Sequence, residues 1–111
     1  MQKNEDEFQD TIFHFACCYG HSKMVNLLLT ESANLNINLN ARNEYGHTAF
    51  HLACIFGRKD IVEIMIEHAE SSKLNFKIKC DSGKTAIQIA ESNEFHDVVD
   101  LIKRKLPAGT F

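Results

Sequence analysis

Two pairs of side chains in this sequence have the residue types and spacing of metal ligands. His14 and Cys17 lie three residues apart, and so do His51 and Cys54, which on a helix places each pair on one face. Two such pairs brought together could hold a zinc ion. A third segment of the same pattern has glutamine and glutamate at these positions. We therefore predict no metal and no other cofactor, and we interpret the four residues as structural.

Catalytic residues are not indicated either. Nucleophilic catalysis needs a nucleophile and a base that meet in a pocket, and the cysteines and histidines of this chain already have places in a repeated pattern. The sequence has no phosphate-binding loop, no dinucleotide-binding glycine motif and no serine-centred nucleophile elbow. We predict that the protein is not an enzyme.

The charge of the chain argues against a nucleic-acid partner. The 111 residues carry a net charge of −3, and the pI is about 6.0, whereas nucleic-acid modules usually show a strong basic bias. The basic residues Arg42, Lys79 and Lys84 are interleaved with Glu44 and Asp81. A surface that follows phosphates would carry one sign of charge, so we expect no nucleic-acid binding.

The sequence favours an intracellular location. No stretch approaches the roughly 20 apolar residues of a membrane-spanning helix, so no membrane association is expected. The first eight residues, MQKNEDEF, lack the apolar run of a signal peptide. The four cysteines are too few for a disulfide scaffold. We expect free thiols in a cytoplasmic or nuclear protein, either whole or part of a longer chain.

An internal repeat is the strongest signal in the sequence. The hexapeptides TIFHFA, TAFHLA and TAIQIA begin at residues 11, 48 and 85, so the spacing is 37 residues both times. The same register continues downstream in Cys17 and Cys54, in Gly20 and Gly57, and in Val25, Val62 and Val99. A repeated unit of this length predicts a stack of similar supersecondary elements that share a continuous core.

Each unit has the pattern of a helix, a tight turn and a second helix. In the middle unit, apolar residues recur at helical spacing over residues 49–56. Gly57 then ends this helix, because glycine readily takes the left-handed conformation of a helix end. A second apolar pattern follows Asp60. Between units, short extended segments lead into polar turns at residues 43–46 and 80–83, which predicts hairpins.

The combination of Gly-x-Thr-x-x-His-x-Ala, a turn glycine, an apolar second helix and a hairpin resembles the ankyrin repeat, over about residues 4–106. The resemblance implies an all-α solenoid of stacked helix-turn-helix units with short β-hairpin loops. It also implies that the histidine ties the threonine-capped turn by hydrogen bonds. The expected domain covers residues 1–111, with repeats at about 4–39, 40–76 and 77–106 and a short tail at 107–111.

The units are longer than the usual ankyrin repeat of about 33 residues. Alignment of the second helices places the four extra residues between Leu29 and Asn40, and again between Ile66 and Lys77. Four residues correspond to about one helical turn. We expect either a second helix that is one turn longer or a bulged loop on the convex side.

The two end units are expected to act as caps. The first unit has Gln9 in place of the hairpin glycine, so a complete hairpin before it is not expected. The third has Glu94 in place of the turn glycine, and its last helix becomes polar at residues 103–105 before Pro107. Terminal repeats need polar outer faces for solubility.

Ankyrin-like domains bind proteins through the hairpin tips and the exposed face of the first helices. The resemblance therefore implies a partner-binding surface in all three units. Its predicted residues are Phe8, Asp10 and Tyr19 in the first unit, Glu44, Tyr45, His47, Ile55 and Phe56 in the second, and Asp81 and Lys84 in the third.

Two aromatic pairs stand out on this surface. In the repeat register Phe8 aligns with Tyr45, and Tyr19 aligns with Phe56. Together with Ile55 they are expected to form an apolar strip with an acidic rim, which favours a partner that carries basic residues. The alternative is that Tyr19 and Phe56 fold back as additional core.

The resemblance implies a monomeric adaptor or scaffold that binds another protein. Two alternatives remain: an inhibitor that masks one dedicated target, and a structural unit that acts as a spacer or self-associates. The resemblance also places Asn40 where ankyrin hairpins carry an asparagine that a dioxygenase can hydroxylate. For Asn40 the alternative is a local structural role through hydrogen bonds to backbone.

Overall fold

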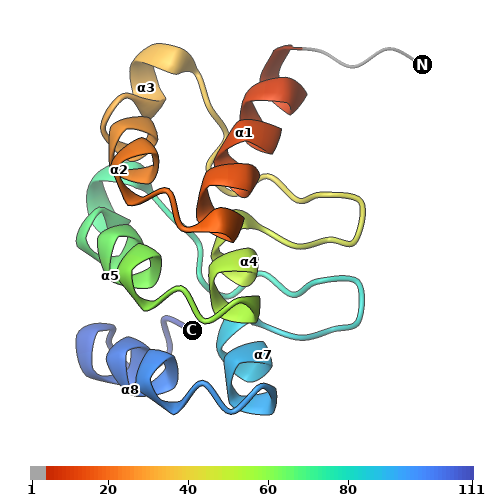
Figure 1. The fold of residues 1–111 in the computed structure, drawn as a ribbon, viewed down its shortest axis with the longest axis vertical. Coiled ribbons are helices and arrows are strands. Elements are labelled where there is room, and N and C mark those ends of the chain that lie inside the picture. Colours follow the sequence, from red (N-terminus) through yellow and green to blue (C-terminus); the bar gives the residue numbers. More distant parts are fainter. Residues whose placement is uncertain (1–4) are drawn as a thin grey trace.

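The protein is a stack of helix pairs (Figure 1). The computed structural model describes the backbone of residues 5–111 and the side chains of residues 12–111. Eight helices are found in this part of the chain. They are α1 (Glu5–Tyr19), α2 (Ser22–Thr30), α3 (Ser32–Leu35), α4 (Ala49–Ile55), α5 (Lys59–Glu67), α6 (Ala69–Ser72), α7 (Ala86–Ser92) and α8 (His96–Lys105).

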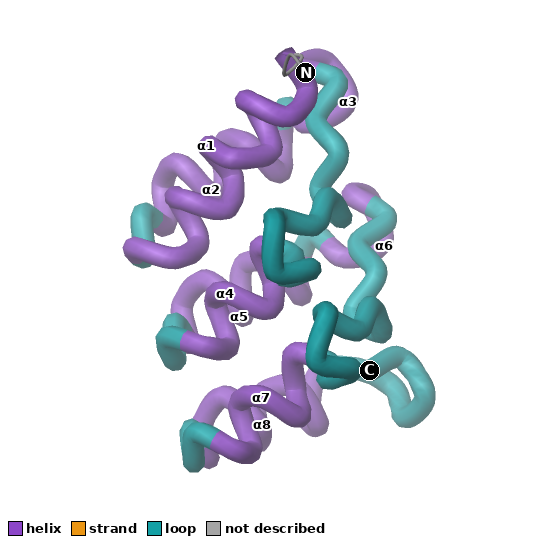
Figure 2. Tube along the Cα trace, turned by 90° about the vertical axis from the view of Figure 1, so that its right-hand side faces the viewer, coloured by secondary structure: helices purple, strands orange, loops and turns teal. Residues whose placement is uncertain are grey.

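The helices form two layers, as expected for an all-α solenoid. The first helices α1, α4 and α7 pack on one another in order, and the second helices α2, α5 and α8 do the same beside them. The loops that connect successive units project from the layer of first helices (Figures 1 and 2). A continuous core runs through the stack, and Phe50 packs edge-on against Phe76 within it, with ring centroids 4.6 Å apart.

Reciprocal hydrogen bonds cap the first helices of the second and third units. The Thr48 hydroxyl accepts a bond from the His51 backbone N–H, and Nδ1 of His51 accepts one from the Thr48 backbone N–H, both at 3.2 Å. Thr85 and Gln88 make the same capping box. The threonine caps predicted from the hexapeptides are therefore confirmed in these two units, where a proline at the first helical position is missing.

The turn between the two helices of each unit contains a residue with left-handed backbone. Gly57 has a φ of 63° and Gly20 a φ of 75°, while Glu94 occupies the corresponding position in the third unit with a φ of 62°. The predicted role of Gly57 is confirmed. Glu94 adopts a conformation that costs a side chain with a Cβ atom roughly 1–2 kcal/mol.

The extra residues of the long repeat form separate short helices. Helices α3 and α6 follow α2 and α5 after breaks at Glu31 and His68. Each short helix ends at a residue in the left-handed conformation, Asn36 or Lys73. The insertion lies where the sequence placed it, and its form is a one-turn helix after a break rather than a longer second helix.

The inter-unit loops are tight turns without β-strands in residues 5–111. In the first loop the Asn43 backbone N–H donates to the carbonyl of His47 at 2.9 Å, and Gly46 donates back to Asn43 at 2.9 Å. The second loop repeats this at Cys80 and Lys84, at 2.9 Å. The hairpins thus have the expected turn, but the strand pairing is limited to this single closing bond.

The first unit differs from the expected register at its start. Helix α1 begins at Glu5 and runs through residues 8–11, whereas the second and third units begin their first helices directly after the threonine. Within the described residues no complete hairpin precedes the first unit, which agrees with Gln9 in the glycine position. Phe8 and Asp10, predicted as partner-binding residues, belong to α1, and their side chains lie outside the described residues.

Candidate functional site

The tip of the first inter-unit loop is held by one asparagine side chain. Oδ1 of Asn43 accepts hydrogen bonds from the backbone N–H groups of Tyr45, at 2.9 Å, and His47, at 3.0 Å. A side chain that bonds backbone two to four residues further on fixes a turn in the way a backbone bond would. The Tyr45 and His47 side chains therefore start from a rigid backbone.

Adjacent loops are joined to each other. The backbone N–H of Asp81 donates to the Tyr45 carbonyl at 3.2 Å. The Arg42 guanidinium donates to the carbonyls of Gly46, at 3.2 Å, and Lys79, at 3.0 Å, and it lies 3.5 Å from the Asp81 carboxylate. A Cβ atom on Gly46 would meet the Asp81 backbone nitrogen at 2.7 Å, so only glycine allows this approach. The two loop tips consequently form one platform.

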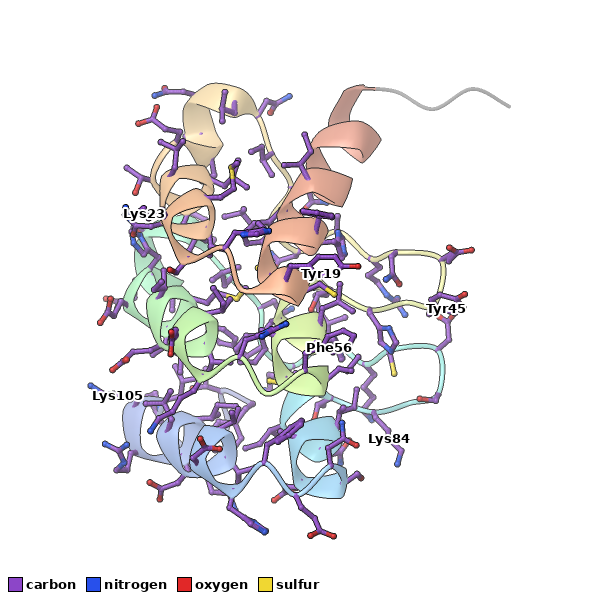
Figure 3. The ribbon with its side chains drawn as sticks, viewed as in Figure 1. Tyr19, Lys23, Tyr45, Phe56, Lys84 and Lys105 are labelled. Carbon is purple, nitrogen blue, oxygen red and sulfur yellow. The ribbon has the colours of Figure 1, made fainter. Side chains whose placement is uncertain are left out.

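Three of the predicted aromatic residues of the surface, Tyr19, Tyr45 and Phe56, are exposed. The exposed fractions of Tyr19, Tyr45 and Phe56 are 58%, 62% and 49%, so the alternative that Tyr19 and Phe56 form extra core does not hold. Figure 3 shows Tyr45 at the loop tip, with Tyr19 and Phe56 at the ends of their helices. Of the other predicted residues, Glu44, Asp81 and Lys84 are exposed and His47 and Ile55 are half-buried.

Two aromatic clusters lie on this surface. The ring of Tyr19 lies 4.7 Å from that of Phe15 and 6.5 Å from that of His21. The Tyr45 ring lies 6.2 Å from that of His47 in the same loop. One cluster is thus at the end of α1 and the other at the loop tip.

The buried histidines link successive units. Nε2 of His14 donates to the carbonyl of His47 at 3.0 Å, and Nε2 of His51 donates to the carbonyl of Lys84 at 3.1 Å. Burial lowers the pKa of His51 and, against a raising effect of Asp81, also that of His47. The His47 and His51 rings therefore favour the neutral form, in which one nitrogen donates and the other accepts.

Cys17 and Cys54 behave as core residues. All four cysteines are free, and burial raises the pKa of Cys17 far above its usual range and that of Cys54 to about 12. A thiol with so high a pKa is a poor nucleophile and metal ligand. Across the side chains of residues 12–111, no three of the histidines, cysteines, aspartates and glutamates are grouped so as to hold a metal ion.

Asn40 links the two successive inter-unit loops. Its amide Nδ2 donates to the carbonyl of Lys73 at 3.1 Å, and its Oδ1 accepts from the backbone N–H of Asn75 at 2.8 Å. Both ends of the amide are thus bonded to the following inter-unit loop. These bonds reach 33 and 35 residues along the chain, so they differ from the local bonds that were the alternative to a modification site.

These features match a known repeat architecture along most of the chain. A family model for ankyrin repeats in three copies matches residues 13–108. The chain belongs to the ankyrin repeat family. No curated protein gives a significant match to it as a whole sequence. Within residues 5–111, no helix is both long enough and apolar enough to cross a membrane.

A solved structure resembles this ankyrin domain closely in shape. It is a chain of the complex between the predatory endopeptidase Bd0816 from Bdellovibrio bacteriovorus and immunity protein Bd3460. The TM-score is 0.69 and the sequences are 26% identical. The match covers 94% of the present chain and 47% of the other, so the present chain spans about half the length of its structural relative.

Two features of the ankyrin surface were not predicted from the sequence. The sequence pattern marks Arg42 only as one charge among others near the turns, whereas in the structure it joins the two loops. Phe15, with 55% of its surface exposed, had been placed in a repeated apolar pattern together with the half-buried Leu52. The repeat register itself could not reveal the exposure of Phe15, because that depends on whether another unit lies above it.

Proposed function

We propose that this ankyrin domain is a protein-binding module of the adaptor or scaffold kind, without a catalytic step of its own. The binding surface is the platform of the two loop tips together with the exposed ends of the first helices. An intracellular location is part of the proposal. The observation that carries it is the exposure of Tyr19, Tyr45 and Phe56 on a rigid backbone, since exposed aromatic side chains concentrate binding energy at protein interfaces.

The second candidate is an inhibitor that masks one target protein. The solved complex of an endopeptidase with an immunity protein favours this candidate, because one of its chains is similar to the present chain over 94% of its length. Adaptor and inhibitor would use the same surface. They differ in whether one partner or several bind, and in whether the bound partner loses its own activity.

Affinity capture from a cell extract, followed by mass spectrometry, tests the proposed surface. The wild type is compared with the double variant Tyr45→Ala, Phe56→Ala and with a matched control, Leu35→Ala. Leu35 is an exposed apolar residue on α3, away from the loop tips. Both variants are first shown to be folded by circular dichroism.

The expected result is a protein captured by the wild type and by Leu35→Ala but lost in the double variant. A partner that all three proteins retain would place the binding surface elsewhere. If a single partner is captured and its activity falls in proportion to added ankyrin domain, the inhibitor is favoured. Several partners with unchanged activities would favour the adaptor.

A further inference from the structure

The outer side of the first repeat is apolar and open. Helices α1 and α2 form a groove of about 740 Å³ there, and its apolar lining is defined here as the amino-terminal end face. Phe15 and Leu27 are each 55% exposed and Met24 is 45% exposed. The end face consists of Ile12, Phe15, Ala16, Met24 and Leu27.

The repeat register shows what kind of surface this is. Met24 corresponds to Ile61 in the second unit and to Val98 in the third, which are 1% and 0% exposed. Leu27 corresponds to the half-buried Ile64 and to Leu101, which is 1% exposed. In both later units the preceding helix pair covers these positions, because α1 and α2 pack on α4 and α5, and these pack on α7 and α8. The end face therefore continues the series of inter-repeat interfaces.

The opposite end of the stack is polar and does not match this face. On the outer side of the third unit Lys103 lies 3.6 Å from Glu91, at positions where the first two units have Leu29 with Cys17 and Ile66 with Cys54. Charged groups are costly to bury without well-matched partners. Head-to-tail stacking of chains would bury these charges against an apolar groove, so the apolar end face is best covered by another apolar end face.

Charge is also distributed suitably for such a pairing. His21 and Lys23 border the groove at the start of α2, beside the carboxyl end of α1. The acidic residues of the segment 5–10 occupy the first turns of α1, at the other end of this helix. A two-fold axis that lies in the end face and crosses the helices would stack two α1 helices antiparallel. Each acidic segment would then lie over His21 and Lys23 of the other copy.

We propose that the amino-terminal end face binds the same face of a second copy of this chain and so forms a two-fold dimer. The monomer expected from the sequence is replaced by this proposal. The end face adjoins the proposed partner surface, because Phe15 packs on Tyr19. Met24 and Leu27 lie on α2, away from the loop tips, so substitutions there test the dimer separately.

Sedimentation velocity over a range of concentrations tests the proposal on the full chain. We expect a monomer–dimer equilibrium in the wild type, and the concentration series gives its dissociation constant. Leu27→Lys is expected to raise that constant at least about tenfold, because it places a charge in the apolar contact. Leu27 is exposed, so the monomer fold tolerates the change, and circular dichroism verifies this.

A matched control separates this face from the partner surface. Phe56 is 49% exposed, and Phe56→Lys adds the same charge to an exposed apolar position of the second unit. This variant is expected to keep the dissociation constant of the wild type. Zero-length carboxylate–amine cross-linking of mixed light and heavy isotope-labelled protein is expected to join Lys23 of one copy to segment 5–10 of the other.

Three results would overturn the proposal. One is a wild-type protein that stays monomeric up to about 1 mM, where even weak specific contacts are populated. Another is growth beyond the dimer, which would indicate head-to-tail stacking. The third is equal weakening by Leu27→Lys and Phe56→Lys, since the contact would then not be confined to the end face.

Discussion

The two ends of the stack have the same helical architecture but opposite surfaces. At the carboxyl end, α8 turns charged residues outward and its apolar residues inward, where Leu101 is 1% exposed. At the amino end, Leu27 occupies the same register position and is 55% exposed. Burial in a repeat stack thus depends on the presence of a neighbouring unit as much as on residue type. The predictions below test this contrast, from the largest expected effect to the smallest.

Truncation of the two equivalent leucines should give very different losses of stability. Leu101→Ala is expected to lower the free energy of unfolding by about 3 kcal/mol, because it leaves a cavity between units. Leu27→Ala is expected to cost less than about 1 kcal/mol, because the side chain is exposed in the monomer. Urea denaturation at low protein concentration, where chains do not associate, measures both. Equal losses would show that the contribution of a leucine to stability depends on its position in the repeat and not on a neighbouring unit.

The turn between α4 and α5 should tolerate the substitution of its glycine far less well than a surface position tolerates a substitution. Gly57→Val is expected to lower the free energy of unfolding by about 1–2 kcal/mol or more, since Gly57 has a φ of 63°. A Cβ atom there would also approach the Phe95 ring at 3.0 Å. Thermal unfolding followed by circular dichroism measures the effect. An unchanged melting temperature would mean that the turn accepts a side chain at residue 57 without strain.

The second unit should make the stability of the fold sensitive to acid, because it has His51 where the third unit has Gln88. Burial lowers the pKa of His51, so the folded state favours the neutral ring. Its stabilising contribution is complete above the unfolded pKa of about 6.5 and is lost as the pH falls through the folded pKa. His51→Gln keeps an acceptor for the Thr48 cap and is expected to flatten the decline in stability below pH 6.5.

The free energy of unfolding measured against pH, for wild type and His51→Gln, checks this expectation. His47, whose pKa is also lowered by burial, remains in the variant and retains part of the acid sensitivity. Parallel curves for the two proteins would contradict a role for His51. The expected curve of the variant is flatter, because glutamine does not titrate. It is also lower, because glutamine lacks the bond that His51 makes to the Lys84 carbonyl.

The third unit should become slightly more stable with glycine at residue 94, where the other two units have Gly20 and Gly57. Glu94→Gly is expected to raise the free energy of unfolding by up to about 1 kcal/mol, since a φ of 62° is strained for glutamate. The greater chain entropy of unfolded glycine offsets part of this gain. The melting temperature provides the measurement. A loss of stability would indicate that the Glu94 side chain contributes more than its backbone costs.

Much of this fold was predictable because its determinants are local. The 37-residue register, the threonine caps at Thr48 and Thr85, the turn at Gly57 and the position of the inserted residues all follow from chemistry within a few positions along the chain. For the candidate site, the resemblance to ankyrin repeats pointed to Tyr19, Tyr45 and Phe56, and the structure exposes all three.

The remaining features depended on contacts between residues far apart in sequence. The Arg42 clamp joins loops 37 and 39 residues away, and no local pattern encodes it. The start of α1 at Glu5 and the packing of the Tyr19 ring on that of Phe15 were likewise not predicted from the repeat register. The sequence by itself determined which residues repeat and how each unit folds. Only the tertiary structure decided which of the repeated apolar positions are covered, because coverage is a property of neighbouring units.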